Sequence, residues 1–150
     1  MRPEDSHSFE MPEVPGCRVI AAAGSGSRSV VYRARDLKTQ KILAVKVYSA
    51  GAAEGPDDLE SRLRTAIRKL AGVQIPGAVV PTDCIRLTRP DRFALLMEFV
   101  EGDSLTRALQ RSVRFEPWRA VQLGSELART LEAGRREGLC HGSLHTGKIL

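Results

Sequence analysis

The sequence predicts an α+β fold in which a five-stranded antiparallel lobe, interrupted by one helix, leads into a helical lobe. Residues 17–49 are rich in β-branched residues and alternate in polarity, as strands do. Residues 59–70 and 117–138 instead carry apolar residues at helical spacing. Because most strand-type segments come first and the long helical pattern comes last, we expect a strand-rich lobe followed by a helical one.

Three strands are expected at the start of this lobe. Residues 17–23 form a short β-type run that stops at the segment GSGS. Residues 29–36 and 41–49 form a hairpin around the polar turn LKTQ. In the third strand, Ala44 and Lys46 share one face and Val45 and Val47 share the other.

A helix is expected after the loop AGAAEGPDD. Pro56 suits a helix start, and Asp57 followed by Glu60 has the spacing of a capping box. Gly72 is expected to end the helix. The apolar face of this helix is formed by four residues at helical spacing: Leu59, Leu63, Ile67 and Leu70.

Two more strands are expected at 78–88 and 92–100, around the turn RPD, and a short helix then runs to Gln110. Pro117 suits the first turn of a long helix that ends near Gly138. Its apolar side carries leucines at positions 123, 127 and 131. The expected organisation is a flexible lead-in at 1–16, a strand lobe at 17–100, and a connector with the first helices of a second lobe at 101–150.

Composition narrows the class of protein. The chain has 150 residues, a net charge of +5 and 42% hydrophobic residues, which is typical of a globular domain. No apolar run is long enough for a membrane span, and the arginines lack interleaved aromatic residues, so we do not expect nucleic-acid binding. Three scattered cysteines fit a reducing, cytoplasmic location and are expected to be buried.

The segment GSGSRS, residues 24–29, is a weak signal by itself, because a Gly/Ser turn in a hairpin is common. It does not fit a dinucleotide-binding fingerprint, since a strand and not a helix follows it, and it does not fit a Walker A loop. Its meaning comes from the motifs that follow at set intervals. These are Ala44-Val45-Lys46 in the next strand and LLMEFVEGDSL, a strand that ends in an acidic connector.

In this order, the motifs resemble the amino-terminal lobe of eukaryotic-type protein kinases, of the kind that bacteria use as serine/threonine kinases. The resemblance runs from about Val19 to Leu150. It implies a protein-kinase-like fold and an ATP pocket. Lys46 would offer a cation to the phosphates, Val31 and Ala44 would line the adenine slot, and Met97 would be the gatekeeper. The nucleotide-binding positions that the resemblance implies are Gly24, Ser25, Gly26, Ser29, Val31, Ala44, Lys46, Met97, Glu98, Val100 and Ser104.

The chain departs from the kinase pattern on the helix of the strand lobe. The glutamate that pairs with the strand lysine in kinases falls at Ala66. Glu60 is the nearest acid, but it lies nearly two turns upstream, and we attribute it to the capping box.

A second departure lies in HGSLHTGKIL, residues 141–150, which resembles the kinase catalytic loop HRDLKPxNIL. Ser143 stands at the position of the catalytic aspartate, and Lys148 at that of the metal-binding asparagine. A serine hydroxyl cannot accept a proton as a carboxylate does, and a lysine opposes metal binding. This combination is the pattern of a pseudokinase that keeps the frame and loses the chemistry.

We therefore expect a pseudokinase that binds ATP or another nucleotide weakly or not at all, has no metal site and does not depend on Mg²⁺, and regulates or binds other protein regions or proteins. Two alternatives stay open: an active serine/threonine kinase that transfers the γ-phosphate of ATP to proteins, and a basic protein-interaction module. In kinases the DFG motif and the rest of the helical lobe follow the catalytic loop. We therefore expect residues 1–150 to form an incomplete kinase domain.

Overall fold

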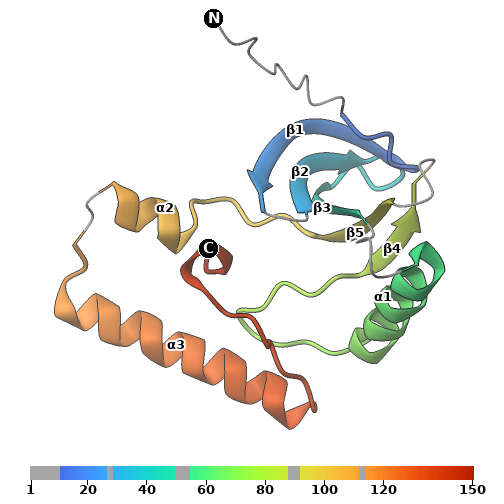
Figure 1. Cartoon of the computed structure of the whole chain (residues 1–150). Helices are drawn as coiled ribbons and strands as arrows, with labels where there is room; N and C mark the ends of the chain where they lie inside the picture. The colour runs from blue at the N-terminus through green and yellow to red at the C-terminus, as the bar shows by residue number, and fades with distance from the viewer. Residues whose placement is uncertain (1–10, 27–28, 50–54, 88–91, 112–113) are drawn as a thin grey trace, which may run out of the picture.

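The strand-rich part of the protein is one twisted antiparallel sheet of five strands in the order β1-β2-β3-β5-β4 (Figure 1). The computed structural model describes residues 11–26, 29–49, 55–87, 92–111 and 114–150. The predicted α+β class and the five strands with one inserted helix are confirmed. The strands are β1 Cys17–Ser25, β2 Ser29–Asp36, β3 Ile42–Ser49, β4 Asp83–Arg86 and β5 Arg92–Glu98.

The predicted alternation in β2 and β3 separates two faces of the sheet. Val45 and Val47 of β3 are buried together with Tyr32 and Ala34 of β2, whereas Lys46 points to the opposite face. Alternate residues of a strand point to opposite sides, so a single register fixes both faces. We call the first group the inner core; it contains Val14, Tyr32, Ala34, Val45, Val47, Leu87 and Ala94.

The part of the opposite face formed by β4 and β5 is covered by α1, Pro56–Leu70. Leu59 is 8% exposed, and Leu63 and Ile67 pack beside it, which confirms the predicted apolar side of the helix. Gly72 lies just beyond the end of α1 with φ +80°, as expected of a helix-ending glycine. We call this group the helix-side core; its buried members are Leu59, Cys84, Phe93 and Leu95.

The predicted capping box at the start of α1 is wrong. Gly55 precedes the helix without a side-chain cap, and Pro56 stands in the first turn. This earlier start places Asp57 inside the helix, where its carboxylate pairs with Arg86 of β4 at 2.7 Å. Glu60 also pairs with Arg86, at 3.1 Å. These acids therefore fasten α1 to β4.

The fourth strand is shorter than predicted and begins at Asp83 instead of residue 78. Pro81 has no N–H and cannot take part in strand pairing on both sides. Thr82, the residue between Pro81 and β4, is the first to bond to the neighbouring strand: its backbone N–H donates to the carbonyl of Leu96 of β5 at 2.8 Å. The predicted turn at residues 89–91 lies outside the described residues.

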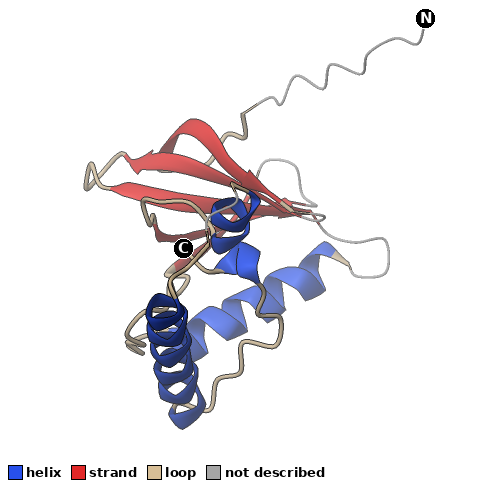
Figure 2. Cartoon of the chain, turned by 90° about the vertical axis from the view of Figure 1, so that its left-hand side faces the viewer, coloured by secondary structure: helices blue, strands red, loops and turns tan. Residues whose placement is uncertain are grey.

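The helical part consists of α2, Leu105–Gln110, the long helix α3, Pro117–Arg136, and a short 3-10 turn η1, Thr146–Lys148. Figure 2 shows the sheet on one side of the molecule and α3 on the other. The loop between α1 and β4 bridges them, because Thr130 of α3 donates a hydrogen bond from its hydroxyl to the carbonyl of Pro76 at 2.9 Å. Gly134 is buried near Ile75 of the same loop.

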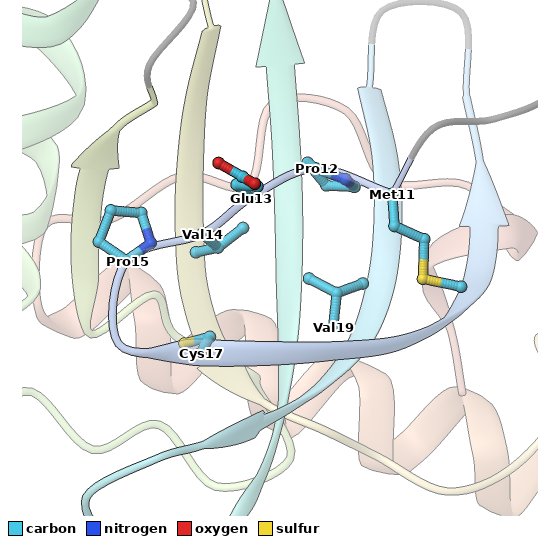
Figure 3. Close-up of a pocket in the computed structure, with 7 residues that line it drawn as sticks. All are labelled: Met11, Pro12, Glu13, Val14, Pro15, Cys17 and Val19. Carbon is cyan, nitrogen blue, oxygen red and sulfur yellow. The ribbon is translucent and has the colours of Figure 1, made fainter.

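Residues 11–16 run back across the sheet before β1 begins (Figure 3). Val14 is 5% exposed and belongs to the inner core, and Gly16 accepts a backbone hydrogen bond from Leu37 at 2.9 Å. A shallow pocket between this segment and β1 is lined by Met11, Pro12, Glu13, Val14, Pro15, Cys17 and Val19. The strand lobe thus takes one core residue from the segment that precedes β1.

All three cysteines are free thiols. Cys84 is buried and Cys17 is half-buried, and burial raises the pKa of both thiols. Cys140 is exposed, so the expectation that all three are buried is wrong for this residue, which follows the end of α3 on the surface. In the part of the chain that the structure describes, no helix is both long and apolar enough to cross a bilayer.

The bridging loop allows a matched stability test of the contact between the lobes. Gly72 and Gly77 both have positive φ, +80° and +79°, but only at Gly77 would a Cβ meet Thr130, 2.6 Å from its hydroxyl oxygen. We expect Gly72→Ala to lower the free energy of unfolding by about 1–2 kcal/mol through backbone strain. Gly77→Ala should cost about 1 kcal/mol more, because it also disrupts the hydrogen bond to Pro76. Urea denaturation measures both, and equal losses would contradict a role for this contact.

Candidate functional site

The glycine loop joins β1 to β2 at one end of the sheet. Gly26 closes it by donating a backbone hydrogen bond to the carbonyl of Ser29 at 2.8 Å, and Ser25 is the last residue of β1. A Cβ added at Gly24 would meet no atom within 4 Å, so this backbone can be approached closely from outside. Residues 27 and 28 of the motif lie outside the described residues.

Behind this loop, the register of the sheet brings three of the predicted residues into one row. Gly24 lies opposite Val31, and Val31 lies opposite Lys46 on the next strand. The neighbouring position on the same face of β3 is Ala44, which is 7% exposed and lies opposite Met97. The predicted adenine slot and the predicted phosphate-binding lysine therefore share one face of the sheet.

The surroundings of Lys46 contain an aromatic ring and no partner carboxylate among the described residues. Its ammonium lies 4.9 Å from the ring centroid of Tyr48. Ala66 is exposed on α1 and carries no acid. Glu60 is engaged elsewhere: its pKa is lowered chiefly by the hydrogen bond from Arg64 and further by the charges of Arg64 and Arg86.

We call the connector that follows β5, residues 98–104, the hinge; it contains the predicted nucleotide-binding residues Glu98, Val100 and Ser104. Glu98 is the last residue of that strand, and Val100 is half-buried after it. Ser104 caps α2, since its hydroxyl accepts a hydrogen bond from the backbone N–H of Arg107 at 3.4 Å. The capping hydrogen bond explains the presence of Ser104 at this position without requiring a contact with a nucleotide.

Sequence reasoning missed a charged contact on the hinge. Arg33 of β2 pairs with Glu101 at 2.9 Å, and its guanidinium lies 5.4 Å from the ring centroid of Phe99. The Nε atom of Arg33 is buried and has no hydrogen-bond partner among the described residues. The one available signal was the face of β2, which Arg33 shares with Val31.

In the loop that resembles the kinase catalytic loop, residues 141–150, a lysine side chain bonds to the backbone of the same loop. The ammonium of Lys148 donates a hydrogen bond to the backbone carbonyl of Ser143 at 2.9 Å. The backbone N–H of Ser143 in turn donates to Nδ1 of His141 at 3.3 Å. A cation therefore lies directly beside the position predicted for the catalytic base, and residues 138–150 contain no carboxylate side chain.

This loop docks on α2, the helix that follows the hinge. The hydroxyls of Thr106 and Thr146 lie 2.7 Å apart, and the backbone N–H of Leu105 donates to the carbonyl of Ile149 at 2.8 Å. Figure 1 shows the chain returning from α3 to a position beside α2, below the sheet. The loop is thus held at the place where the two lobes meet.

The predicted site residues accordingly form two groups. The glycine loop, Lys46 and the hinge belong to the strand lobe, whereas Ser143 and Lys148 lie on the loop beside α2. No hydrogen bond or ion pair between described residues links the two groups directly. Within residues 11–26, 29–49, 55–87, 92–111 and 114–150, no group of three or more His, Cys, Asp or Glu side chains could hold a metal ion.

The predicted basic face of the helices is partly neutralised. Asp103 pairs with Arg107 and Arg111, and Glu132 pairs with Arg135 and Arg136. These are exposed pairs, so they contribute little stability, but they reduce the positive field along α2 and α3.

Known proteins with similar sequences belong to one family. The family model for the protein kinase domain matches residues 18–150, which is nearly the whole chain. The serine/threonine-protein kinase PknA of Mycobacterium tuberculosis is 30% identical over 136 residues, covering 89% of this chain and 31% of the relative. The serine/threonine-protein kinase PknB of Mycolicibacterium smegmatis is 26% identical over 129 residues, covering 85% of this chain and 20% of the relative.

A eukaryotic relative is similarly distant. Protein kinase C of Drosophila melanogaster is 30% identical over 132 residues, covering 87% of this chain and 18% of the relative. The chain thus spans between about a fifth and a third of the length of these three relatives.

Proposed function

Because this chain belongs to the protein kinase family, we propose that it is a pseudokinase domain that binds a nucleotide weakly and acts as a regulatory or binding module. The observation that carries this proposal is the contact between Lys148 and Ser143. This contact holds a cation beside Ser143, the residue that the kinase resemblance aligns with the catalytic aspartate, and an active kinase needs a free carboxylate and a metal ligand there.

The proton-accepting step lacks a suitable group. A kinase base must accept the proton of the substrate hydroxyl, a role worth about 10²–10⁴ in rate. The hydroxyl of Ser143 is not a base near neutral pH. The two histidines of the loop do not supply a free base, because His141 and His145 each accept a backbone hydrogen bond through Nδ1. We therefore expect this loop to have a structural role and not to catalyse phosphate transfer.

The described residues also do not fit Mg²⁺. This ion prefers carboxylate, carbonyl and water oxygens in near-octahedral geometry. The ammonium of Lys148 uses the carbonyl oxygen of Ser143 and would repel a second cation nearby. We assign no step to a metal in this protein.

The strand lobe retains what a nucleotide needs. The accessible backbone at Gly24 and Gly26 can approach phosphate oxygens, and Lys46 supplies a cation in the same row of the sheet. Val31, Ala44 and Met97 are apolar and suit a base. These features support ATP, or another nucleotide, as the ligand.

A second candidate function is supported by the relatives. Two of them are named serine/threonine-protein kinases, and an active kinase would use ATP as phosphoryl donor and protein hydroxyls as acceptors. Retention of Lys46 and the glycine loop fits this candidate, whereas Ser143, Lys148 and Ala66 oppose it. A basic interaction module is less well supported, because exposed acids pair with several arginines of α2 and α3. A cytoplasmic location is part of the first proposal, since the three cysteines are free.

Nucleotide binding tests the proposal. We expect ATP at ten times its dissociation constant to stabilise the protein by about 1.4 kcal/mol, equally with Mg²⁺ and with EDTA. This corresponds to a rise in Tm of about 3–6 °C. Thermal unfolding with ATP, in the presence and absence of Mg²⁺, measures it, and strong stabilisation that requires the metal would refute the proposal.

Two lysine variants serve as controls. Lys46→Met should remove the shift, because it deletes the cation that lies in the row of Gly24 and Val31. Lys41→Met removes an exposed lysine just before β3 and should leave the shift unchanged. An equal response of both variants would show that ATP binds elsewhere.

A further inference from the structure

Lys46 and Tyr48 lie two residues apart on β3 and therefore project from the same face of the sheet. The ammonium lies 4.9 Å from the ring centroid, which is within the range of a cation–π contact. The ring itself packs against the helix-side core. Its position is therefore set by the core and not by solvent.

No carboxylate on α1 competes with this ring for the ammonium. The position one turn before Leu70 is Ala66, and Glu60 pairs with Arg64 at 2.8 Å and with Arg86 at 3.1 Å. Asp57 also pairs with Arg86. Among the described residues, the ring of Tyr48 makes the cation–π contact with the Lys46 ammonium.

We propose that Tyr48 is the positioning residue for Lys46 and takes the role that a helix carboxylate would otherwise have. The face of an aromatic ring attracts an ammonium through its quadrupole but carries no net charge. The full positive charge of Lys46 is therefore left for a phosphate oxygen, and a charge-assisted contact of this kind is stronger than a neutral one. This inference rests on the proposed nucleotide site.

This arrangement separates the orientation of Lys46 from the position of α1. A lysine held by a glutamate on a helix is correctly placed only when that helix is in position. Here the partner is on the same strand as the lysine, so the strand sets the spacing of the two side chains and α1 supplies no charged partner for the ammonium. The helix is fastened independently, through Arg86 of β4 to Asp57 and Glu60.

Substitutions that separate the ring from the hydroxyl test the proposal. Tyr48→Phe keeps the ring and should leave ATP affinity within about twofold, whereas Tyr48→Met keeps an apolar side chain without a ring and should weaken ATP binding by about 3- to 30-fold. Isothermal titration calorimetry without Mg²⁺ measures both on the intact chain. Equal affinities for the Phe and Met variants would overturn the proposal.

A matched variant on the helix tests the separation. Arg86→Gln breaks the ion pairs to α1 and should lower the stability of the protein without changing ATP affinity. A loss of affinity as large as that of Tyr48→Met would show that α1 does control Lys46, and would overturn this part of the inference.

A nucleotide-free measurement keeps this inference distinct from the proposed function. The ring current of Tyr48 should shift the ε-methylene proton resonances of Lys46 upfield, in the unmutated chain and in Tyr48→Phe, but not in Tyr48→Met. The difference from Lys46→Met assigns the signal. Unshifted resonances in the unmutated chain would overturn the contact between Lys46 and Tyr48 directly. If the shift is present but Lys46→Met binds ATP as well as the parent, the proposed nucleotide site is wrong, and with it the role of Tyr48 there.

Discussion

The purified protein is expected to transfer no phosphate from ATP to itself or to a generic protein substrate. Active kinases use a carboxylate to accept the proton of the attacking hydroxyl, and its loss costs about 10²–10⁴ in rate. Here Ser143 stands at that position, with the ammonium of Lys148 at 2.9 Å from its carbonyl oxygen. Radiolabelled ATP provides the measurement, and incorporation that Lys46→Met abolishes would contradict the pseudokinase proposal.

Restoring the carboxylate alone should not restore transfer. In Ser143→Asp the new side chain would share a short loop with the ammonium of Lys148. An adjacent cation lowers the pKa of a carboxylate, and a carboxylate with a lowered pKa is a weaker base. We therefore expect Ser143→Asp to remain at background, because Lys148 still neutralises the new carboxylate.

The double variant Ser143→Asp/Lys148→Asn is the informative comparison, because it removes the cation that would neutralise the new base. Activity in the single variant would show that Lys148 does not block this position. Activity that appears only in the double variant would support the electrostatic argument made here.

Much of the strand lobe could be predicted from the sequence because its signals are local. The alternation of Val45, Lys46 and Val47 fixes which side chains enter the inner core, and this prediction is confirmed. The apolar side of α1 follows in the same way from the helical spacing of Leu59 and Leu63. Patterns of period 2 and 3.6 are contained within one element, so no knowledge of the neighbouring elements is needed.

The errors and omissions come from contacts between distant segments. The sequence predicts a capping role for Glu60 because its partner Arg86 lies 26 residues away, and no local pattern connects the two. The hydrogen bond from Thr130 to Pro76 spans 54 residues. Pairings of this kind depend on how whole elements pack, which the sequence does not state directly.

For the candidate site, too, local features could be predicted and contacts between separate residues could not. Its residues could be listed from ordered motifs, but the contacts that decide their chemistry could not. Tyr48 could have been found, because residues two apart on a strand share a face. The contact of Lys148 with the carbonyl of Ser143 could not, since it depends on the turn η1 between them.

The second large expected effect concerns the stability of residues 1–150 as a separate polypeptide. The predicted apolar side of α3 is only partly covered: Leu123 and Leu127 are half-buried, and Leu131 is 40% exposed. Val121 is exposed as well, at 69%. Fully burying a side chain of this kind is worth about 1.5–3 kcal/mol, so several of them together approach the whole stability of a small domain.

We therefore expect this polypeptide to be marginally stable or to self-associate, because an exposed apolar stripe favours association. Sedimentation velocity measures the association. Leu131→Lys should shift the protein towards monomer, since it places a charge within the stripe. Leu37→Lys is the matched control: Leu37 is 55% exposed but lies in the hairpin turn after β2, so its replacement should change association little.

Hydrogen exchange on the same polypeptide locates the weakness. The strands around Lys46 have two buried cores, one on each face of the sheet, and their amides should be strongly protected. In α3 the only buried residue is Gly134, within a helix that the structure describes in full, so its amides should exchange faster. A monomer in which α3 is as well protected as β3 would contradict this expectation. It would mean that the contacts of Thr130 and Gly134 with the loop after α1 are enough to hold the helix in place.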